Sequence, residues 1–211
     1  MAEKTDLWQI ERDLVEQGAE IICGCDEAGA GPLAGPVYAA AVILPPYCQI
    51  EGLNDSKKLT EKKREALYEV ITQKAVCWAV ARVKAAEIDA TDILSARMKA
   101  MQQAIDALTI RPEVALIDGN RDKGRSAAIT TPHKLVVGGD GKSANIAAAS
   151  ILAKVSRDRF VSGELDQCYP EYQFAKHKGY GTKLHYQMLD AYGPCPEHRR
   201  SFLKKWEEKR T

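Results

Sequence analysis

Four acidic side chains lie where short apolar runs give way to glycine. Asp26 and Glu27 follow the apolar run 21–23, and Asp118 and Asp140 each precede a glycine at the end of another apolar run. Because ligands in open α/β sheets collect at the carboxyl ends of strands, we expect these acids to converge if the runs are neighbouring strands. Converging carboxylates repel unless cations lie among them, and oxygen-only ligation suits Mg²⁺ or Mn²⁺. Two such ions can activate water and stabilise the leaving oxygen in phosphodiester cleavage.

Taken singly, these acids have an ordinary alternative. Two adjacent acids before a glycine-rich turn can be solvated in that turn, and a lone Asp-Gly usually marks a turn as well. Adjacent side chains on a strand point to opposite faces, so Asp26 and Glu27 cannot share one core. The repetition at three apolar strand ends favours a metal site over three unrelated turns.

The elements that would position these acids mix strands and helices along the chain, which predicts an α/β protein built on a mixed sheet. Strands are predicted over five apolar runs, residues 21–26, 37–44, 75–83, 114–117 and 135–137. Helices are predicted over 5–17, 60–74, 88–108, 143–161 and 182–191, and in a basic segment from about 196. We expect a short N-terminal helical segment, residues 1–18, and a single domain over 19–211 that includes the C-terminal helices at about 182–211.

The composition is that of an ordinary globular protein: of 211 residues, 45% are hydrophobic and 28% are charged. No uncharged apolar stretch is long enough to span a membrane, and the N-terminus lacks the order of a signal peptide, so we expect a cytoplasmic protein. The six scattered cysteines contain no Cys-x-x-Cys pair, and the four histidines lack zinc-ligand spacing relative to them. These patterns predict reduced thiols rather than a structural zinc site.

The formal net charge of +1 conceals an uneven distribution. Residues 1–20 are acidic overall, whereas residues 55–64 and 170–211 are basic. Basic clusters beside a group of acids are typical of a protein that binds a polyanion, with metal ions bridging the reacting phosphate to carboxylates. The alternative for any one cluster is a solvated helix face.

The glycine-rich segment 29–34 formally matches the G-x-G-x-x-A fingerprint of dinucleotide-binding proteins. That fingerprint must open a helix whose N-terminus holds the pyrophosphate. Here Pro32 and Pro36 precede the apolar run 37–44, which favours a strand. We therefore predict no nucleotide cofactor, and a turn whose glycines let the backbone approach a ligand closely.

The chain resembles the bacterial ribonuclease HII family over residues 10–205. The matching segments, in order, are 26–29, 31–36, 53–59, 117–120, 150–158, 177–180 and 198–202. The resemblance implies a ribonuclease H-like mixed five-stranded sheet flanked by helices, with a C-terminal helical extension. It also implies a metal-dependent endonuclease with a two-metal site for Mg²⁺ or Mn²⁺. Such an enzyme hydrolyses the RNA strand of RNA/DNA hybrids and cuts 5′ of ribonucleotides embedded in duplex DNA, leaving 3′-hydroxyl and 5′-phosphate ends.

The same resemblance implies the roles of individual residues. The catalytic, metal-binding carboxylates would be Asp26, Glu27, Asp118 and Asp140. The substrate would be held by Gly29, Ala30, Gly31, Lys57 and Tyr180. Backbone groups of the turn 29–31 would grip the 2′-hydroxyl side of an RNA–DNA junction, and Tyr180 would stack on the next sugar. Lys57, Lys58 and the basic C-terminal residues would hold backbone phosphates.

Two positions depart from the family pattern. The family carries arginine between the glycines of its turn, where this chain has Ala30, and often carries lysine where this chain has Gly138. Both changes remove positive charge near the scissile phosphate. The alternative to an active nuclease is therefore a catalytically weakened RNA/DNA-hybrid-binding protein of the same fold. In either case we expect a monomer that binds neither a membrane nor a nucleotide cofactor.

Four further residues have structural interpretations. Asp158, late in a predicted helix beside Arg157, is interpreted as one member of a surface pair rather than a further site acid. His177 and His198 are interpreted as structural or phosphate-facing, because hard cations prefer oxygen ligands. Without the family resemblance, Tyr180 in its Gly-Tyr-Gly turn would be interpreted as a loop aromatic packed on the core.

Overall fold

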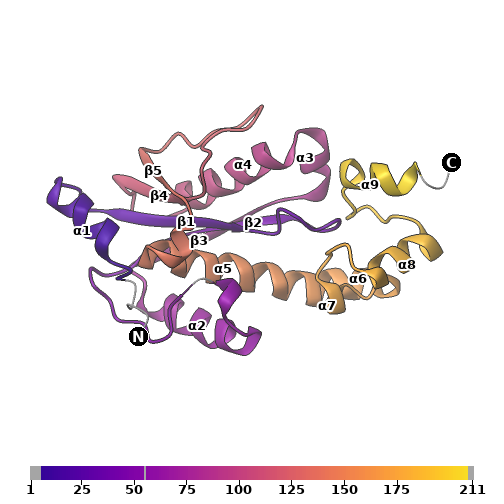
Figure 1. Ribbon diagram of the computed structural model, residues 1–211, viewed down its shortest axis with the longest axis horizontal. Helices are drawn as coiled ribbons and strands as arrows, with labels where there is room; N and C mark the ends of the chain where they lie inside the picture. The colour runs from indigo at the N-terminus through magenta and orange to yellow at the C-terminus, as the bar shows by residue number, and fades with distance from the viewer. Residues whose placement is uncertain (1–5, 55, 209–211) are drawn as a thin grey trace.

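The computed structural model describes residues 6–54 and 56–208, and its centre is one five-stranded mixed sheet (Figure 1). The strands are β1 (Ile22–Ala28), β2 (Val37–Ile43), β3 (Cys77–Val83), β4 (Val114–Asp118) and β5 (His133–Val136). Their order is β3-β2-β1-β4-β5. β1 pairs with β2 and β2 with β3 in antiparallel fashion, whereas β1–β4 and β4–β5 are parallel. The predicted mixed five-stranded sheet is confirmed.

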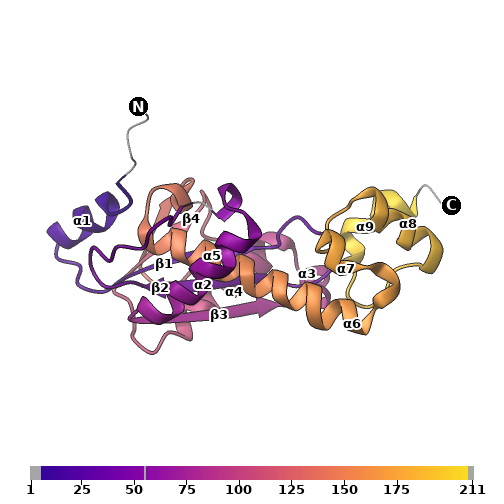
Figure 2. The same cartoon turned by 90° about the horizontal axis from the view of Figure 1, so that it is seen from below.

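Helices cover both faces of the sheet and extend beyond one end of it (Figures 1 and 2). The α-helices are α1 (Gln9–Glu16), α2 (Glu61–Lys74), α3 (Ala85–Ala90), α4 (Ile93–Asp106), α5 (Ala144–Phe160), α6 (Asp166–Cys168), α7 (Phe174–His177), α8 (Lys183–Tyr192) and α9 (Arg200–Glu207). Short 3₁₀ or π turns are η1 (Ser56–Lys58), η2 (Gly139–Gly141), η3 (Val161–Leu165) and η4 (Pro170–Tyr172). Within the described ranges, no helix is both long and apolar enough to cross a membrane.

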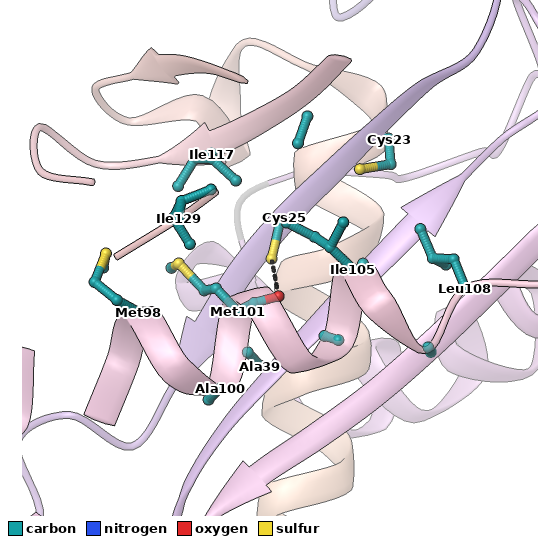
Figure 3. Close-up of a cluster of buried hydrophobic side chains, with 14 of the residues drawn as sticks. Cys23, Cys25, Ala39, Met98, Ala100, Met101, Ile105, Leu108, Ile117 and Ile129 are labelled. Carbon is teal, nitrogen blue, oxygen red and sulfur yellow. Dashed lines mark hydrogen bonds between the residues drawn. The ribbon is translucent and has the colours of Figure 1, made fainter. Parts of the chain in front are cut away.

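Two apolar layers hold the sheet, one on each face. On one face, Cys25 of β1 packs among residues of α4, and its Sγ donates to the carbonyl of Met101 over 3.8 Å (Figure 3). On the other face, α5 and α2 cover β1 and β2, with Ala148 and Ile71 in that layer. The small residues of α5 allow close approach: a Cβ at Gly24 would lie 2.2 Å from the backbone of Asn145.

Several predicted boundaries are confirmed and others are wrong. The predicted N-caps of α2 and α5 are confirmed, because the side chains of Thr60 and Ser143 accept hydrogen bonds from the first turns of those helices. The single helix predicted over 88–108 is wrong. The chain forms α3 and α4 instead, and Asp92 caps α4 by accepting from the amide of Ser95 at 2.9 Å.

Other corrections concern the ends of elements. β1 continues past its predicted end at Asp26 because its ladder with β2 runs on to the pair of Ala28 with Tyr38. β5 begins two residues earlier than predicted, and the loop predicted over 168–181 contains η4 and α7. The last helix begins at Arg200 rather than near Pro196. The first helix begins at Gln9, later than the predicted start at residue 5, which itself lies outside the described residues. The domain boundary at 18 stays a prediction.

Candidate active site

Sheet register brings the predicted acids of β1 and β4 to one end of neighbouring strands. Cys25 pairs with Ile117 in the parallel β1–β4 ladder, so the next residues, Asp26 and Asp118, emerge side by side. The chain then crosses from β5 into η2, where the amide of Gly139 donates to Asp118 Oδ1 at 2.6 Å. That contact positions the following residue of η2, the buried Asp140. Three of the four predicted acids therefore meet at the junction of β1, β4 and η2.

Asp26 is the electrostatic centre of this group. Burial, followed by the negative charges of Glu27, Asp118 and Asp140, raises the pKa of the Asp26 carboxyl well above its ordinary value of 3.8. The backbone amide of Glu27 donates to Asp26 Oδ1 at 2.7 Å and opposes that rise. A carboxylate pushed toward its neutral form by burial and by three like charges is one whose ionised form a bound cation would stabilise.

Glu27 lies on the opposite face of β1 from Asp26, as the alternation of a strand requires. Its Oε1 contacts Nη2 of Arg97 on α4 at 2.6 Å. Its other oxygen, Oε2, is buried without a hydrogen-bond partner in the described part of the chain, and so is Nε of Arg97. The sequence does not predict this ion pair, because Arg97 and Glu27 are far apart along the chain.

The donor set fits a divalent cation. It consists of carboxylate oxygens, which hard cations prefer, and one of them is an unpartnered buried atom of Glu27. Among the described residues, no three acidic, histidine or cysteine side chains are grouped closely enough to hold a metal ion as they lie. Binding would therefore require these side chains to move closer together.

The predicted substrate residue Lys57 lies next to the acids. Its Nζ is 3.9 Å from Asp140 Oδ2, and 82% of its side chain is exposed. Gly138, the position where the resemblance leads us to expect a lysine, has a φ of +64°. This left-handed conformation favours glycine, so a lysine at position 138 would have to accept backbone strain in this geometry.

The glycine-rich turn after β1 is held by two arginines whose role the sequence did not reveal. Arg199 donates to the carbonyls of Gly29, Ala30 and Gly35 at 2.7, 3.0 and 3.0 Å. Arg157 donates to the backbone carbonyls of three further residues, Pro36, Ala34 and Lys178. Both arginines are fully buried.

Gly29 is required where Arg157 crosses the turn. Its φ is +91°, and a Cβ there would lie 2.0 Å from Nε of Arg157. Ala30 is half-buried and Gly31 is exposed at the tip. Arginine is usually found at the surface, where it is solvated or binds phosphate. The sequence therefore does not predict that these two arginines are buried and hold the turn.

Tyr180 is joined to the same turn. The amide of Leu33 donates to the carbonyl of Gly179 at 2.8 Å, which ties the two loops together. Tyr180 is 42% exposed, and its ring centroid lies 5.8 Å from the guanidinium carbon of Arg157 and 5.8 Å from Nζ of Lys154. Its exposed ring is available to stack on a ligand, whereas the alternative of a residue packed in the core would bury it.

Three buried histidines support the Tyr180 loop. His185 lies 3.0 Å from the carbonyl of Tyr180 through Nδ1, and its Nε2 lies 2.9 Å from Nε2 of His198. His177 stacks on His185 at a centroid distance of 4.2 Å, and its Nδ1 accepts from the amide of Gly179. Since these contacts are all within protein, the structural interpretation of His177 and His198 agrees with the geometry.

Acid is expected to destabilise this histidine cluster. Burial, assisted by the neighbouring imidazoles, lowers the pKa of His185 to about 4 and that of His198 to about 3. Their stabilising contribution is complete above the ordinary histidine pKa of 6.5 and is lost as the pH falls below it. We expect the free energy of unfolding to fall by roughly 2 kcal/mol per histidine between pH 7 and pH 5.

Urea unfolding at a series of pH values measures this effect. The variant His198→Gln should lose less stability over that interval than the parent chain. Parallel curves for His198→Gln and the parent would contradict the assignment.

Three other expectations can be compared with the structure. The surface pair of Asp158 with Arg157 is wrong: Asp158 is 6% exposed and pairs with Lys154 at 2.8 Å, because Arg157 turns inward to the glycine-rich turn. The six cysteines are free thiols, as predicted. A strand, β2, follows the glycine-rich turn, so the segment does not have the helix that the dinucleotide fingerprint requires.

The sheet order and the acids at neighbouring strand ends define a protein of the ribonuclease H-like class. The solved ribonuclease H2 from Pyrococcus horikoshii OT3 superposes with a TM-score of 0.72 and 27% identity over 90% of this chain and 98% of that one. A more distant structure, Bst-RNase HIII in complex with Mn²⁺, shares the fold with a TM-score of 0.58 and 18% identity over 83% of this chain and 64% of that one.

Comparison of sequences identifies the family. The family model for ribonuclease HII matches residues 23–207. The ribonuclease HII of Idiomarina loihiensis is 55% identical over 182 residues, which cover 86% of this chain and 95% of the relative. The chain belongs to the ribonuclease HII family.

Proposed function

We propose that this chain is a metal-dependent endonuclease that hydrolyses the RNA strand of RNA/DNA hybrids and cuts 5′ of single ribonucleotides embedded in duplex DNA. The products would carry 3′-hydroxyl and 5′-phosphate ends. The observation that carries the proposal is the buried Asp26, whose pKa is raised by burial and by the charges of Glu27, Asp118 and Asp140. Membership of the ribonuclease HII family supports the same conclusion.

The metal part of the proposal rests on the donor set. Carboxylate oxygens and one unpartnered buried atom of Glu27 suit Mg²⁺ or Mn²⁺, and a relative with the same fold has been solved with Mn²⁺. Asp26, Asp118 and Asp140 would hold two such ions together with Glu27. When bound, the ions supply an activated water and stabilise the leaving oxygen of the phosphodiester.

The protein's own residues would select and hold the substrate. The turn 29–31, fixed from behind by Arg157 and Arg199, would present backbone groups to the 2′-hydroxyl, the feature that distinguishes RNA from DNA. Tyr180 would stack on the next sugar, and Lys57 would hold a phosphate beside Asp140. The proposal takes the chain to act as a monomer in the cytoplasm, which gel filtration and cell fractionation would test.

A cleavage assay tests this function. An end-labelled DNA duplex with one ribonucleotide is incubated with the chain and Mg²⁺ or Mn²⁺, beside an all-DNA duplex of the same sequence. We expect one cut, 5′ of the ribonucleotide, and no cut in the control duplex. Asp118→Asn should slow this cut by at least about 10²-fold, because it removes a metal-binding charge beside Asp26.

The rival function, a weakened hybrid-binding protein, gives a different result. The chain would then bind the ribonucleotide-containing duplex but leave it uncut with either metal. Restoring positive charge through Ala30→Arg would in that case be expected to restore cutting, because Ala30 lies in the turn proposed to face the substrate.

A further inference from the structure

Arg97 contacts the proposed site because of the way α4 packs against β1. On one face of β1, Cys25 donates through its sulfur to the carbonyl of Met101 on α4 (Figure 3). Glu27 is two residues further along the same face of β1, and Arg97 is one helical turn before Met101. The packing of Cys25 on Met101 therefore sets Glu27 against Arg97, at 2.6 Å between Oε1 and Nη2.

The ion pair between Glu27 and Arg97 uses only one of the two carboxylate oxygens. Both side chains are largely removed from solvent, with 12% of Glu27 and 28% of Arg97 exposed. A bidentate pair would use both carboxylate oxygens, yet Oε2 of Glu27 and Nε of Arg97 are buried without hydrogen-bond partners among the described residues. Leaving charged atoms buried and unpaired is unfavourable, so each partner retains capacity for another ligand. For an unpartnered carboxylate oxygen one residue after the buried Asp26, the fitting ligand is a cation.

We propose that Arg97 is a positioning residue that serves as a reversible counter-ion for Glu27. It neutralises Glu27 while the metal is absent and yields the carboxylate when a divalent cation binds, so it sets the affinity of the site for that cation. The inference rests on the proposed function for the identity of the site. It assigns a role to a residue of α4 that neither the motifs nor the family resemblance singled out.

Charge balance explains why such a counter-ion is useful here. Besides burial, the charges of Glu27, Asp118 and Asp140 raise the pKa of Asp26, so negative charge is crowded around that carboxyl. The family's cation at position 30 is absent, because Ala30 occupies it. Lys57 contacts Asp140 but is highly exposed, and exposed charges interact weakly in water. Arg97 is better buried, so its charge acts on Glu27 more strongly.

Mn²⁺ binding tests the inference without any cleavage. The electron paramagnetic resonance signal of free Mn²⁺ gives the dissociation constant for four chains: the parent, Arg97→Met, Glu27→Gln and the double variant. Methionine keeps the apolar stem and removes the charge. We expect Arg97→Met to tighten Mn²⁺ binding by about 5–10-fold, because Glu27 no longer has a competing partner. In the Glu27→Gln background the same change should alter the dissociation constant by less than about 2-fold.

The outcomes separate the possible roles. Unchanged or weaker Mn²⁺ binding by Arg97→Met would overturn the inference, since Arg97 would then only support Glu27. An equal effect in both backgrounds would also overturn it, because the charge would then repel the metal without acting through Glu27. Arg97→Lys keeps the charge and is expected to bind Mn²⁺ like the parent. If Arg97→Met fails to fold, tighter binding by Arg97→Gln decides in its place.

The test also separates this inference from the proposed function. If the chain cuts a ribonucleotide-containing duplex but Arg97→Met does not change Mn²⁺ binding, the proposed function stands and the counter-ion role of Arg97 is wrong. If Arg97→Met tightens Mn²⁺ binding but the chain cuts no substrate, the counter-ion role of Arg97 stands and the proposed nuclease function is wrong.

Discussion

Asp26→Asn is expected to abolish cleavage and to make the metal-free chain more stable. Cleavage should fall by at least about 10³-fold, because the central carboxylate of the proposed metal site is removed. Stability should rise because burial, together with the charges of Glu27, Asp118 and Asp140, disfavours the ionised form of the Asp26 carboxyl in the fold, a cost that asparagine does not carry. We expect a gain on the order of 1 kcal/mol, or about 2–4 °C in Tm for a chain of this size.

The pH dependence of that gain follows from the raised pKa of Asp26. A carboxyl whose pKa is raised on folding stabilises the fold while it is protonated, and it loses that contribution as the pH rises. The asparagine side chain of the variant is neutral at every pH, so the gain should be full at neutral pH. It should shrink as the pH falls toward 3.8, the ordinary pKa of aspartate.

Urea unfolding in a metal chelator and the cleavage assay measure the two effects on the same preparations. The control is Asp106→Asn, at an exposed acid of α4 that hydrogen-bonds to Gln102. It should leave both activity and stability close to those of the parent. A less stable, fully active Asp26→Asn chain would contradict the assignment of Asp26.

Arg199→Met is expected to be among the most destabilising single changes in the chain. Its guanidinium is fully buried, and it satisfies the carbonyls of Gly29, Ala30 and Gly35. Burial lowers the pKa of this arginine to about 9. Removing the guanidinium leaves three carbonyls of the turn without their donor, so we expect the free energy of unfolding to fall by about 3–5 kcal/mol.

The neighbouring residue provides a matched control. The side chain of Arg200 is 57% exposed and pairs with Glu207 on the surface at 3.3 Å. Arg200→Met should therefore change the free energy of unfolding by less than about 1 kcal/mol. Urea unfolding at pH 7.5 distinguishes the two variants, and equal losses would show that the turn does not depend on Arg199.

The sequence predicts the parts of the site that depend on local pattern. A short apolar run followed by an acid and a glycine marks a strand end, and this pattern located Asp118 at the end of β4. Which strands pair with one another depends on tertiary packing. From the sequence alone, Asp26 and Asp118 are therefore predicted to be close only if their two strands are neighbours. The register of β1 with β4 supplies that condition.

Contacts that depend on burial were not predictable in the same way. An arginine in a basic C-terminal cluster is typical of a surface residue, and only the packed structure shows Arg199 directed inward. Likewise, Arg157 was interpreted as the partner of Asp158, since the two are adjacent, whereas the structure pairs Asp158 with Lys154. The break between α3 and α4 had a local signal, because Thr91-Asp92 is followed by an apolar run and Asp is a favoured N-cap.

The contacts of Arg199 with the glycine-rich turn affect the order in which parts of the chain fold. Arg199 contacts Ala30 and Gly29 across 169 and 170 positions of sequence. Closing so long a loop is slow compared with forming local helices, and during synthesis Arg199 emerges well after the turn that it contacts. The strands that carry the carboxylates can therefore pair before the turn beside them is ordered. The surface proposed to distinguish RNA from DNA is thus completed only after residue 199 has been made.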